Sequence, residues 1–363
     1  MPWPTLDDVR RLARWKPPLG VISIYLRLDP GDRGGRWRTE LSNGLSSVLE
    51  RKDGLGHEAA TALRATCERL GERFADHERS LPRAEVGFVE VAAKAGSESW
   101  WAGHVSAESS PAAFFDEQPL VAPLVCMLER GASRGVALIS AERVRLLEWA
   151  PGHVEELESW EMSVFSDDWR ERKAQRPSDP ARSQAVSASG RDQFEERLEE
   201  NRHRFLGECG RLVAGPAEAR RWSQLIIFGA ADHVREFRRG LNLPGVAIGP
   251  GGDADLISEP AGKLEVALAD AAKALDAERD RELVERTLES ARGGMRGAAG
   301  TQETEAALAE ARVDTLVLDA GFAARCEQLV RRALDGGANV VAVTGKAAEL
   351  LSSVDGSAAL LRY

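Results

Sequence analysis

The chain contains 363 residues, of which 43% are hydrophobic and 29% are charged, and its formal net charge is −10. This length exceeds one ordinary hydrophobic core, so two or three domains are expected. The negative charge argues against a protein that coats nucleic acid indiscriminately, because such binding depends on neutralising phosphates. Arginine-rich segments still allow contacts with nucleic acid on chosen faces.

The hydropathy pattern predicts a cytoplasmic protein without a membrane partner. No window approaches the roughly 18 apolar residues that a membrane helix requires, and the N-terminal segment lacks the apolar stretch of a signal peptide. The four cysteines lie far apart, without a CxxC pair or a histidine at metal-ligand spacing. We therefore expect reduced, mostly buried thiols and neither a metal, a cofactor nor a disulfide.

Residues 1–130 predict an α+β domain. Apolar and polar positions alternate over residues 20–28, which indicates a strand, and a helical pattern follows over residues 37–49. The segment HEAATALRATCERLGERFADHERSL predicts a second helix, whereas EVGFVEV and WWAGHV have the pattern of strands.

Residues 131–261 predict an α/β domain. Two strands, at 136–140 and 144–149, are separated by a tight turn, and the hydrophilic tract from Asp167 to Gly190 is predicted to be a loop. An amphipathic helix follows this loop. SQLIIFGA then has the pattern of a buried strand, and ADHVREFRRGL that of a helix.

Residues 262–363 predict an α/β/α sandwich, which a long helix at 261–291 connects to the middle domain. Helical and strand patterns alternate through TQETEAALAEAR, VDTLVLD, ARCEQLVRRALDGG and NVVAVTG. KAAELLSSVDG and AALLRY complete the alternation.

Glycine-rich motifs give no indication of a catalytic or phosphate-binding loop. GPGGDAD lacks the lysine of a P-loop, and GGMRGAAG follows a helix instead of a strand, so a flexible loop is expected there. No GxSxG motif is present, and the histidines are scattered.

Four segments resemble parts of a known family. GGANVVAVTGKAAELLSSVDGSAALLRY and GAAGTQETEAALAEARVDTLVLD are similar to the third domain of the archaeal and eukaryotic class-1 release factors and Pelota. GVALISAERVRLLEWAPGHVEEL and RFLGECGRLVAGPAEARRWSQLIIFGAADHVREF resemble the second domain. Over residues 131–363 the chain resembles the bacterial, Balon-like members of this family, which implies three domains with a ribonuclease-H-like middle domain.

The resemblance also implies where a functional loop would lie. In the release factors a Gly-Gly-Gln loop precedes the long helix of the second domain, and its glutamine reaches the peptidyl-transferase centre. Ser187, Ala188 and Ser189, followed by Gly190, stand in that position here. The motif is degenerate, so no catalytic residue is expected; Gln184 is the candidate replacement if the loop rearranges.

The partner that the resemblance implies is the ribosome, at the rRNA of the A site. Arginine suits such a surface because its planar fork binds phosphates and stacks on bases. The candidate RNA-binding residues are Arg33, Arg36, Arg38, Arg170, Arg172, Lys173, Arg176, Arg182, Arg191 and Arg202. The third domain resembles one that binds a translational GTPase in release factors, and neither DNA nor a membrane is expected as a partner.

The leading hypothesis is a ribosome-associated factor that occupies the A site in rescue or hibernation. Stop-codon reading is not expected, because no Asn-Ile-Lys-Ser motif occurs near RKDGLGHEAA at residues 51–60. The second hypothesis is a peptidyl-tRNA hydrolase that uses Gln184 or a serine of the loop. The third is an adaptor for protein partners.

Overall fold

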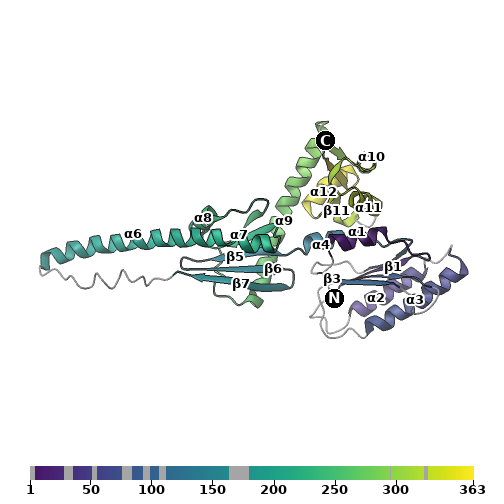
Figure 1. Ribbon diagram of the computed structural model, residues 1–363, viewed down its shortest axis with the longest axis horizontal. Helices are drawn as coiled ribbons and strands as arrows, with labels where there is room; N and C mark the ends of the chain where they lie inside the picture. Colours follow the sequence, from purple (N-terminus) through teal and green to yellow (C-terminus); the bar gives the residue numbers. More distant parts are fainter. Residues whose placement is uncertain are drawn as a thin grey trace. The chain divides into compact units, whose positions relative to one another are not determined.

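The computed structural model forms two compact units, Met1–Ala132 together with Asp276–Tyr363, and Ser133–Leu275. The residues that the structure describes are 5–27, 36–50, 55–75, 84–92, 99–105, 112–162, 180–294, 296–322 and 326–363. In this part of the chain the strands form three sheets of a mixed α/β fold (Figure 1). The expected domain boundaries after residues 130 and 261 stay predictions, and helix α9 (Ala261–Arg292) contributes residues to both units.

The N-terminal sheet is antiparallel, with strand order β3-β2-β1-β4. Two helices, α2 and α3, pack on one face (Figure 1), where Ile22, Ile24 and Leu26 meet the apolar side chains of both helices. Alternation along β1 sends Tyr25 to the other face. The elements are β1 (Val21–Arg27), α2 (Arg36–Glu50), α3 (His57–Ala75), β2 (Ala84–Glu90), β3 (Trp100–Val105) and β4 (Ala112–Asp116).

The second face of this sheet shares one hydrophobic core with the C-terminal part of the same unit. Helices α1 (Leu6–Arg14) and α4 (Ala122–Arg130) contribute to this core together with Tyr25 and Phe88. Leu329 and Val330 of helix α11 (Glu327–Asp335) belong to the same cluster. The N-terminal sheet therefore depends on residues more than 200 positions later to bury its second face.

The C-terminal sheet has strand order β10-β13-β11-β12, and only the β11–β12 pair is parallel. Leu316 and Leu318 face α10 and α11, whereas Val317 faces α9 and α12, so helices cover both faces. The elements are β10 (Gly297–Ala299), α10 (Thr301–Ala309), β11 (Val313–Asp319), η2 (Ala320–Phe322), β12 (Asn339–Val343), α12 (Lys346–Leu351), η3 (Ser352–Val354) and β13 (Ser357–Leu361).

The expected loop at GGMRGAAG is in part a strand, because β10 pairs with β13 through Gly297–Ala299. A Cβ at Gly297 would lie 2.4 Å from the backbone nitrogen of Ala291, so the glycine permits a close approach to α9. The glycines here serve packing as well as the turn.

A buried ionic cluster joins α4, α9 and β12. Arg130 donates to Asp280 at 2.6 Å and to the carbonyl oxygen of Ala342 at 2.7 Å. Arg279 contacts Asp280 at 2.9 Å and Glu129 at 3.0 Å, and Glu129 accepts the Ala342 N–H at 3.1 Å. The Asp280 side chain is 1% exposed. Each charge is thus matched by an opposite charge, which buried ions require.

Helix α4 is also held at its N-terminus. The Glu327 carboxylate accepts the backbone N–H groups of Val121 at 3.0 Å and Ala122 at 2.8 Å. Arg331 pairs with Glu327 at 2.8 Å and donates to the carbonyl oxygens of Ala13 and Pro119. Because the first N–H groups of a helix lack intrahelical partners, Glu327 supplies the cap that α4 does not carry itself.

Acidification should strengthen the contribution of the Glu129 carboxyl to stability. Burial raises the pKa of Glu129, although Arg279 and the Ala342 N–H act in the opposite direction. The folded state then binds this proton more tightly, so between the unfolded and the raised pKa the free energy of unfolding falls as pH rises. We expect the wild type to gain stability relative to Glu129→Gln when urea unfolding is measured at pH 5 instead of pH 7. An unchanged difference between the two proteins would contradict this prediction.

The middle sheet has strand order β7-β6-β5-β8-β9. The β5–β6 and β6–β7 pairs are antiparallel, whereas β5, β8 and β9 run parallel. Helices α6, α7 and α8 pack on one face, and the first half of α9 packs on the other. The elements are β5 (Arg134–Ile139), β6 (Arg143–Ala150), β7 (His153–Glu161), α6 (Pro180–Leu212), α7 (Ala214–Ala219), β8 (Gln224–Phe228), α8 (Ala231–Gly240) and β9 (Ala247–Gly252).

Helices α6 and α8 meet closely at glycines. A Cβ at Gly210 would lie 2.3 Å from the carbonyl oxygen of Phe237, and one at Gly240 would lie 2.0 Å from the carbonyl oxygen of Gly207. At Gly207 itself a Cβ would meet nothing within 4 Å. The two helix backbones therefore touch where side chains are absent, which fixes α8 against α6.

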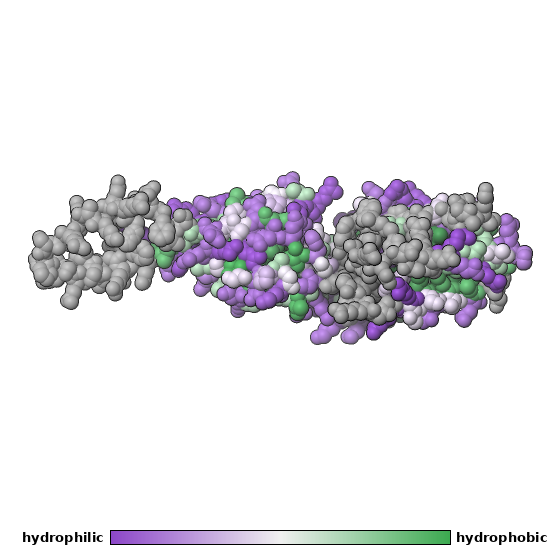
Figure 2. Space-filling model, turned by 90° about the horizontal axis from the view of Figure 1, so that it is seen from below, coloured by the Kyte–Doolittle hydropathy of each residue, from purple (hydrophilic) through white to green (hydrophobic). Residues whose placement is uncertain are grey.

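Hydrophilic residues predominate on the face shown in Figure 2, with apolar residues between them. No helix in the described part of the chain is long and apolar enough to cross a membrane. The four cysteines are free thiols, and Cys67, Cys209 and Cys326 are buried, as the sequence predicts.

Candidate functional site

Helix α6 contains the residues that stand in the position of the Gly-Gly-Gln loop. The loop predicted over Asp167 to Gly190 is wrong from Pro180 onward, because Pro180–Leu212 is one helix (Figure 1). Residues 163–179 lie outside the described residues. Proline is favourable in the first turn of a helix, and alanine has the highest helix propensity. A single glycine such as Gly190 reduces the stability of a helix by only about 1 kcal/mol relative to alanine.

Ser187, Ala188, Ser189 and Gly190 thus have helical backbone, as does Gln184. A segment in this conformation lacks the unusual backbone angles that a Gly-Gly pair would provide. Their position as the equivalent of a peptidyl-transferase-centre loop stays a prediction.

The candidate RNA-binding residues fall into three groups. Arg36 and Arg38 lie on α2 of one unit, and Arg182, Arg191 and Arg202 lie on α6 of the other. The third group lies outside the described residues: Arg33, Arg170, Arg172, Lys173 and Arg176. The described candidates therefore do not form a single cluster within one unit.

Arg38 and Arg202 illustrate contacts that these arginines make within the protein. The guanidinium of Arg38 lies 5.2 Å from the centroid of the Trp37 ring. Arg202 lies 3.6 Å from the Glu142 carboxylate, which belongs to the turn between β5 and β6. This ion pair links α6 to the β5–β6 hairpin, so the positive charge of Arg202 is partly balanced by the Glu142 carboxylate.

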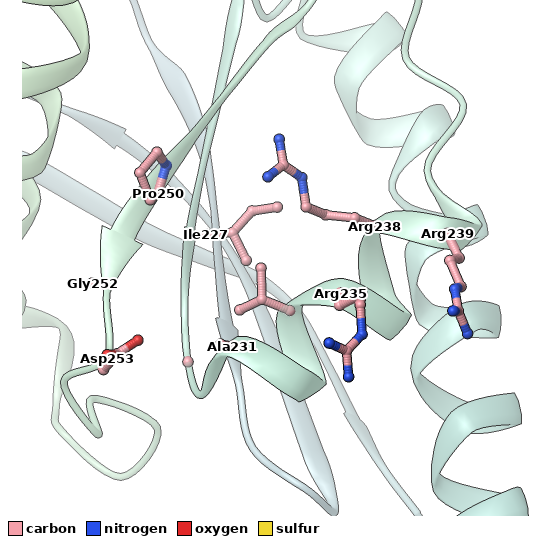
Figure 3. A pocket seen from close by; sticks show the side chains of 10 residues that line it. Ile227, Ala231, Arg235, Arg238, Arg239, Pro250, Gly252 and Asp253 are labelled. Carbon is pink, nitrogen blue, oxygen red and sulfur yellow. The ribbon is translucent and has the colours of Figure 1, made fainter.

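A cavity that sequence reasoning missed lies at the carboxyl ends of β8 and β9, beside α8 (Figure 3). Its volume is about 550 Å³. The carboxyl ends of parallel strands are where ligands bind in open α/β sheets. The lining residues are Ile227, Gly229, Ala231, Val234, Arg235, Arg238, Arg239, Pro250, Gly252 and Asp253.

The arginines of this cavity come from consecutive turns of α8. Arg235 lies 2.6 Å from Asp232, and Arg239 lies 2.6 Å from Glu236. Arg238 donates to the carbonyl oxygen of Ile248 at 3.4 Å, the long end of the hydrogen-bond range. The cavity thus combines cationic side chains with an apolar wall.

The charged side chains that line the cavity are arginines and one aspartate. None of its lining residues is a histidine, cysteine, serine or lysine, and Asp253 is the carboxylate among them. Across the described ranges, no group of three or more His, Cys, Asp or Glu side chains is placed to hold a metal ion. Guanidinium groups beside an apolar wall are suited to binding an anionic ligand.

Comparisons with known proteins agree with the sequence resemblance. Residues 132–248 match the family model of bacterial archaeo-eukaryotic release factor family 5. The uncharacterized protein YocB of Bacillus subtilis (strain 168) is 20% identical over 243 residues, which cover 66% of this chain and 89% of that relative. The resemblance to the release-factor and Pelota family is thereby confirmed for the middle of the chain.

Solved structures with similarity to this chain include three archaeal proteins. A model of ribosome-bound archaeal Pelota and ABCE1 contains a chain that is 14% identical, with coverage of 100% of this chain and 95% of that one and a TM-score of 0.43. Archaeoglobus fulgidus Pelota is 13% identical, with coverage of 100% and 94% and a TM-score of 0.36. The archaeal translation termination factor aRF1 is 17% identical, with 99% coverage of both chains and a TM-score of 0.27.

Proposed function

We propose that this chain, whose residues 132–248 match a bacterial archaeo-eukaryotic release factor family, is a cytoplasmic translation factor that binds the ribosomal A site in rescue or hibernation. We expect it neither to read stop codons nor to hydrolyse peptidyl-tRNA. A translational GTPase is the candidate partner of its C-terminal sheet and helices.

The observation that carries the proposal is the extent of the family match. The matched residues run from the start of the middle unit to β9 and include the whole of α6. The strand order β7-β6-β5-β8-β9, with three parallel strands after an antiparallel hairpin, also supports a ribonuclease-H-like middle domain. In the family that the sequence resembles, this domain reaches the peptidyl-transferase centre.

The residues at the start of α6 support the proposed absence of hydrolysis. Ser187 to Ser189 provide neither paired glycines nor a glutamine, and their backbone is helical. Water attack on an ester requires a group that holds the water within hydrogen-bond reach of the carbonyl carbon. A helix of small side chains does not supply that geometry, so we expect ribosome binding without hydrolysis of peptidyl-tRNA.

The proposal predicts that the protein sediments with bacterial ribosomes, and that its bound fraction falls as salt is raised, because phosphate contacts release counterions. A variant with Arg172, Lys173 and Arg176 replaced by Glu should lose most binding at low salt. The matched control replaces three other arginines, Arg64, Arg211 and Arg332, by Glu, and should bind like the wild type.

Two results would overturn parts of this proposal. A folded wild type that stays in the supernatant at low salt would refute ribosome binding. Release of peptide from stalled ribosomes by the wild type, lost in Gln184→Ala, would replace the binding factor by a hydrolase. Binding by the wild type, together with loss in the first triple variant only, would support the proposal and disfavour an adaptor for protein partners.

A further inference from the structure

The cavity at the ends of β8 and β9 has an apolar wall and a charged rim. Ile227, Val234 and Pro250 are apolar lining residues. In Figure 3, Arg238 extends along one side of the cavity, near Ile227. Asp253 stands across the cavity, beyond the end of β9. A ligand that fills the space must therefore offer an apolar surface and an anionic group together.

Glycines with positive φ lie at both strand ends that border the cavity. At Gly252, with φ of +111°, a Cβ would meet nothing within 4 Å, so the main chain there borders open space. At Gly229, with φ of +145°, a Cβ would lie 2.5 Å from the carbonyl oxygen of Ile139, which excludes any larger residue. The end of β9 thus has bare main chain beside open space, whereas Gly229 allows the end of β8 to approach Ile139 closely.

The arginines of α8 remain recruitable by an anion. Arg235 and Asp232 are 61% and 80% exposed, and an exposed pair of this kind contributes only about 0–1 kcal/mol. Within the described residues, Arg238 donates a hydrogen bond of 3.4 Å to the carbonyl oxygen of Ile248. A phosphate would give its guanidinium a shorter, charge-assisted partner.

Simpler ligands use only half of the cavity. Inorganic phosphate would leave the wall of Ile227, Val234 and Pro250 uncovered, and a purely apolar molecule would leave the guanidinium groups unused. A nucleotide has a flat base that can pack on the apolar wall and a phosphate that can bind the arginines. The amino group of a base can donate a hydrogen bond to a carboxylate such as that of Asp253. The volume of about 550 Å³ lies within the roughly 300–1,000 Å³ of small-molecule sites.

We propose that this cavity binds one nucleotide, with its base against Ile227, Val234 and Pro250 and its phosphate on Arg238 and Arg235. The nucleotide is either free or an unpaired residue of RNA, and the chemistry is the same for both sources. This inference rests on the cavity and does not require ribosome binding.

The test measures binding of AMP, GMP, CMP, UMP and a short single-stranded RNA to the full chain by saturation-transfer NMR and calorimetry. We expect saturable binding by the wild type, and about tenfold weaker binding by Arg238→Ala, which loses a charge-assisted contact. Ala231→Trp should weaken binding as well, because Ala231 is an exposed lining residue at the start of α8 where an indole would occupy the cavity. The matched control is Arg211→Ala, which removes an exposed arginine of the same unit outside the cavity.

The comparison of probes identifies the source. Tighter binding of the oligonucleotide than of any mononucleotide assigns the cavity to RNA, and equal affinities assign it to a free nucleotide. The inference is refuted if no probe binds at millimolar concentration, or if folded Arg238→Ala and Ala231→Trp bind like the wild type. Because ribosome sedimentation is measured separately, a protein that fails to sediment but still binds nucleotides would refute the A-site proposal alone.

Discussion

Replacement of Gly210 by alanine is expected to lower the free energy of unfolding of the middle unit by about 1–3 kcal/mol. The added methyl group would lie 2.3 Å from the carbonyl oxygen of Phe237, so α6 and α8 must separate. The loss should exceed the gain of up to about 1 kcal/mol that alanine brings to a helix. Urea unfolding followed by circular dichroism measures the change.

The control for this prediction lies one turn away in the same helix. Gly207→Ala places its methyl group in open space, so only the helix propensity changes and stability should rise by up to about 1 kcal/mol. Opposite signs for the two variants would establish the close helix contact. Equal effects at Gly207 and Gly210 would show that the contact does not determine stability.

Replacement of Asp280 by alanine should destabilise the other unit by about 1–3 kcal/mol, because Arg130 and Arg279 lose a buried acceptor while Glu129 remains beside Arg279. Asp280 accepts from Arg130 at 2.6 Å and from Arg279 at 2.9 Å, and its side chain is 1% exposed. Asp280→Asn keeps the shape and one acceptor, so a smaller loss is expected. Thermal or urea unfolding of the full chain reports both.

A carboxylate on the same helix provides the comparison. Glu278 is 56% exposed and pairs with Arg281 at 2.6 Å, an arrangement that contributes little to stability when it is exposed to solvent. Glu278→Ala should therefore change the free energy of unfolding much less than Asp280→Ala does. A similar loss in both variants would mean that burial of the ionic cluster has no special importance.

The strands rich in apolar residues could be predicted from the sequence, whereas the irregular edge strand could not. The mostly apolar residues 20–28 correspond to β1, where Val21 to Leu26 are buried on both faces of the sheet. In β7, the less exposed positions Val154, Leu157 and Trp160 recur every third residue, which is not a strand period. The reason is a change of register, since Leu146 pairs with Glu158 and Leu147 with Glu156, so one residue of β7 is left over.

Helix α1 did have a sequence signal that could have identified it. Thr5 accepts the N–H of Asp8, and Asp8 accepts the N–H of Thr5, which is the capping box that a Thr-x-x-Asp pattern predicts. The helix at Ser187 to Gly190 had the opposite problem. Its small polar composition is equally typical of a loop, and local composition does not decide between them.

The cavity beside α8 could not be predicted because it depends on neighbours that are distant in sequence. The arginines at positions 235, 238 and 239 have the spacing of a solvated helix face. Their relation to Pro250 and Asp253 appears only once β8 pairs with β9 in parallel. The sequence identifies the arginines of α8, but only the order of the strands in the sheet places the apolar residue Pro250 beside them.

The core that joins the two ends of the sequence has a consequence for biosynthesis. Tyr25, Phe88 and Leu124 are covered by side chains such as Val330 and Leu361, and the whole of Ser133–Leu275 is translated between them. During synthesis the middle unit has its complete set of strands while the first sheet still exposes an apolar face. The unit Ser133–Leu275 is thus completed before the unit that contains both ends of the sequence. A nascent chain that is halted before β13 still exposes an apolar surface of the kind that chaperones bind.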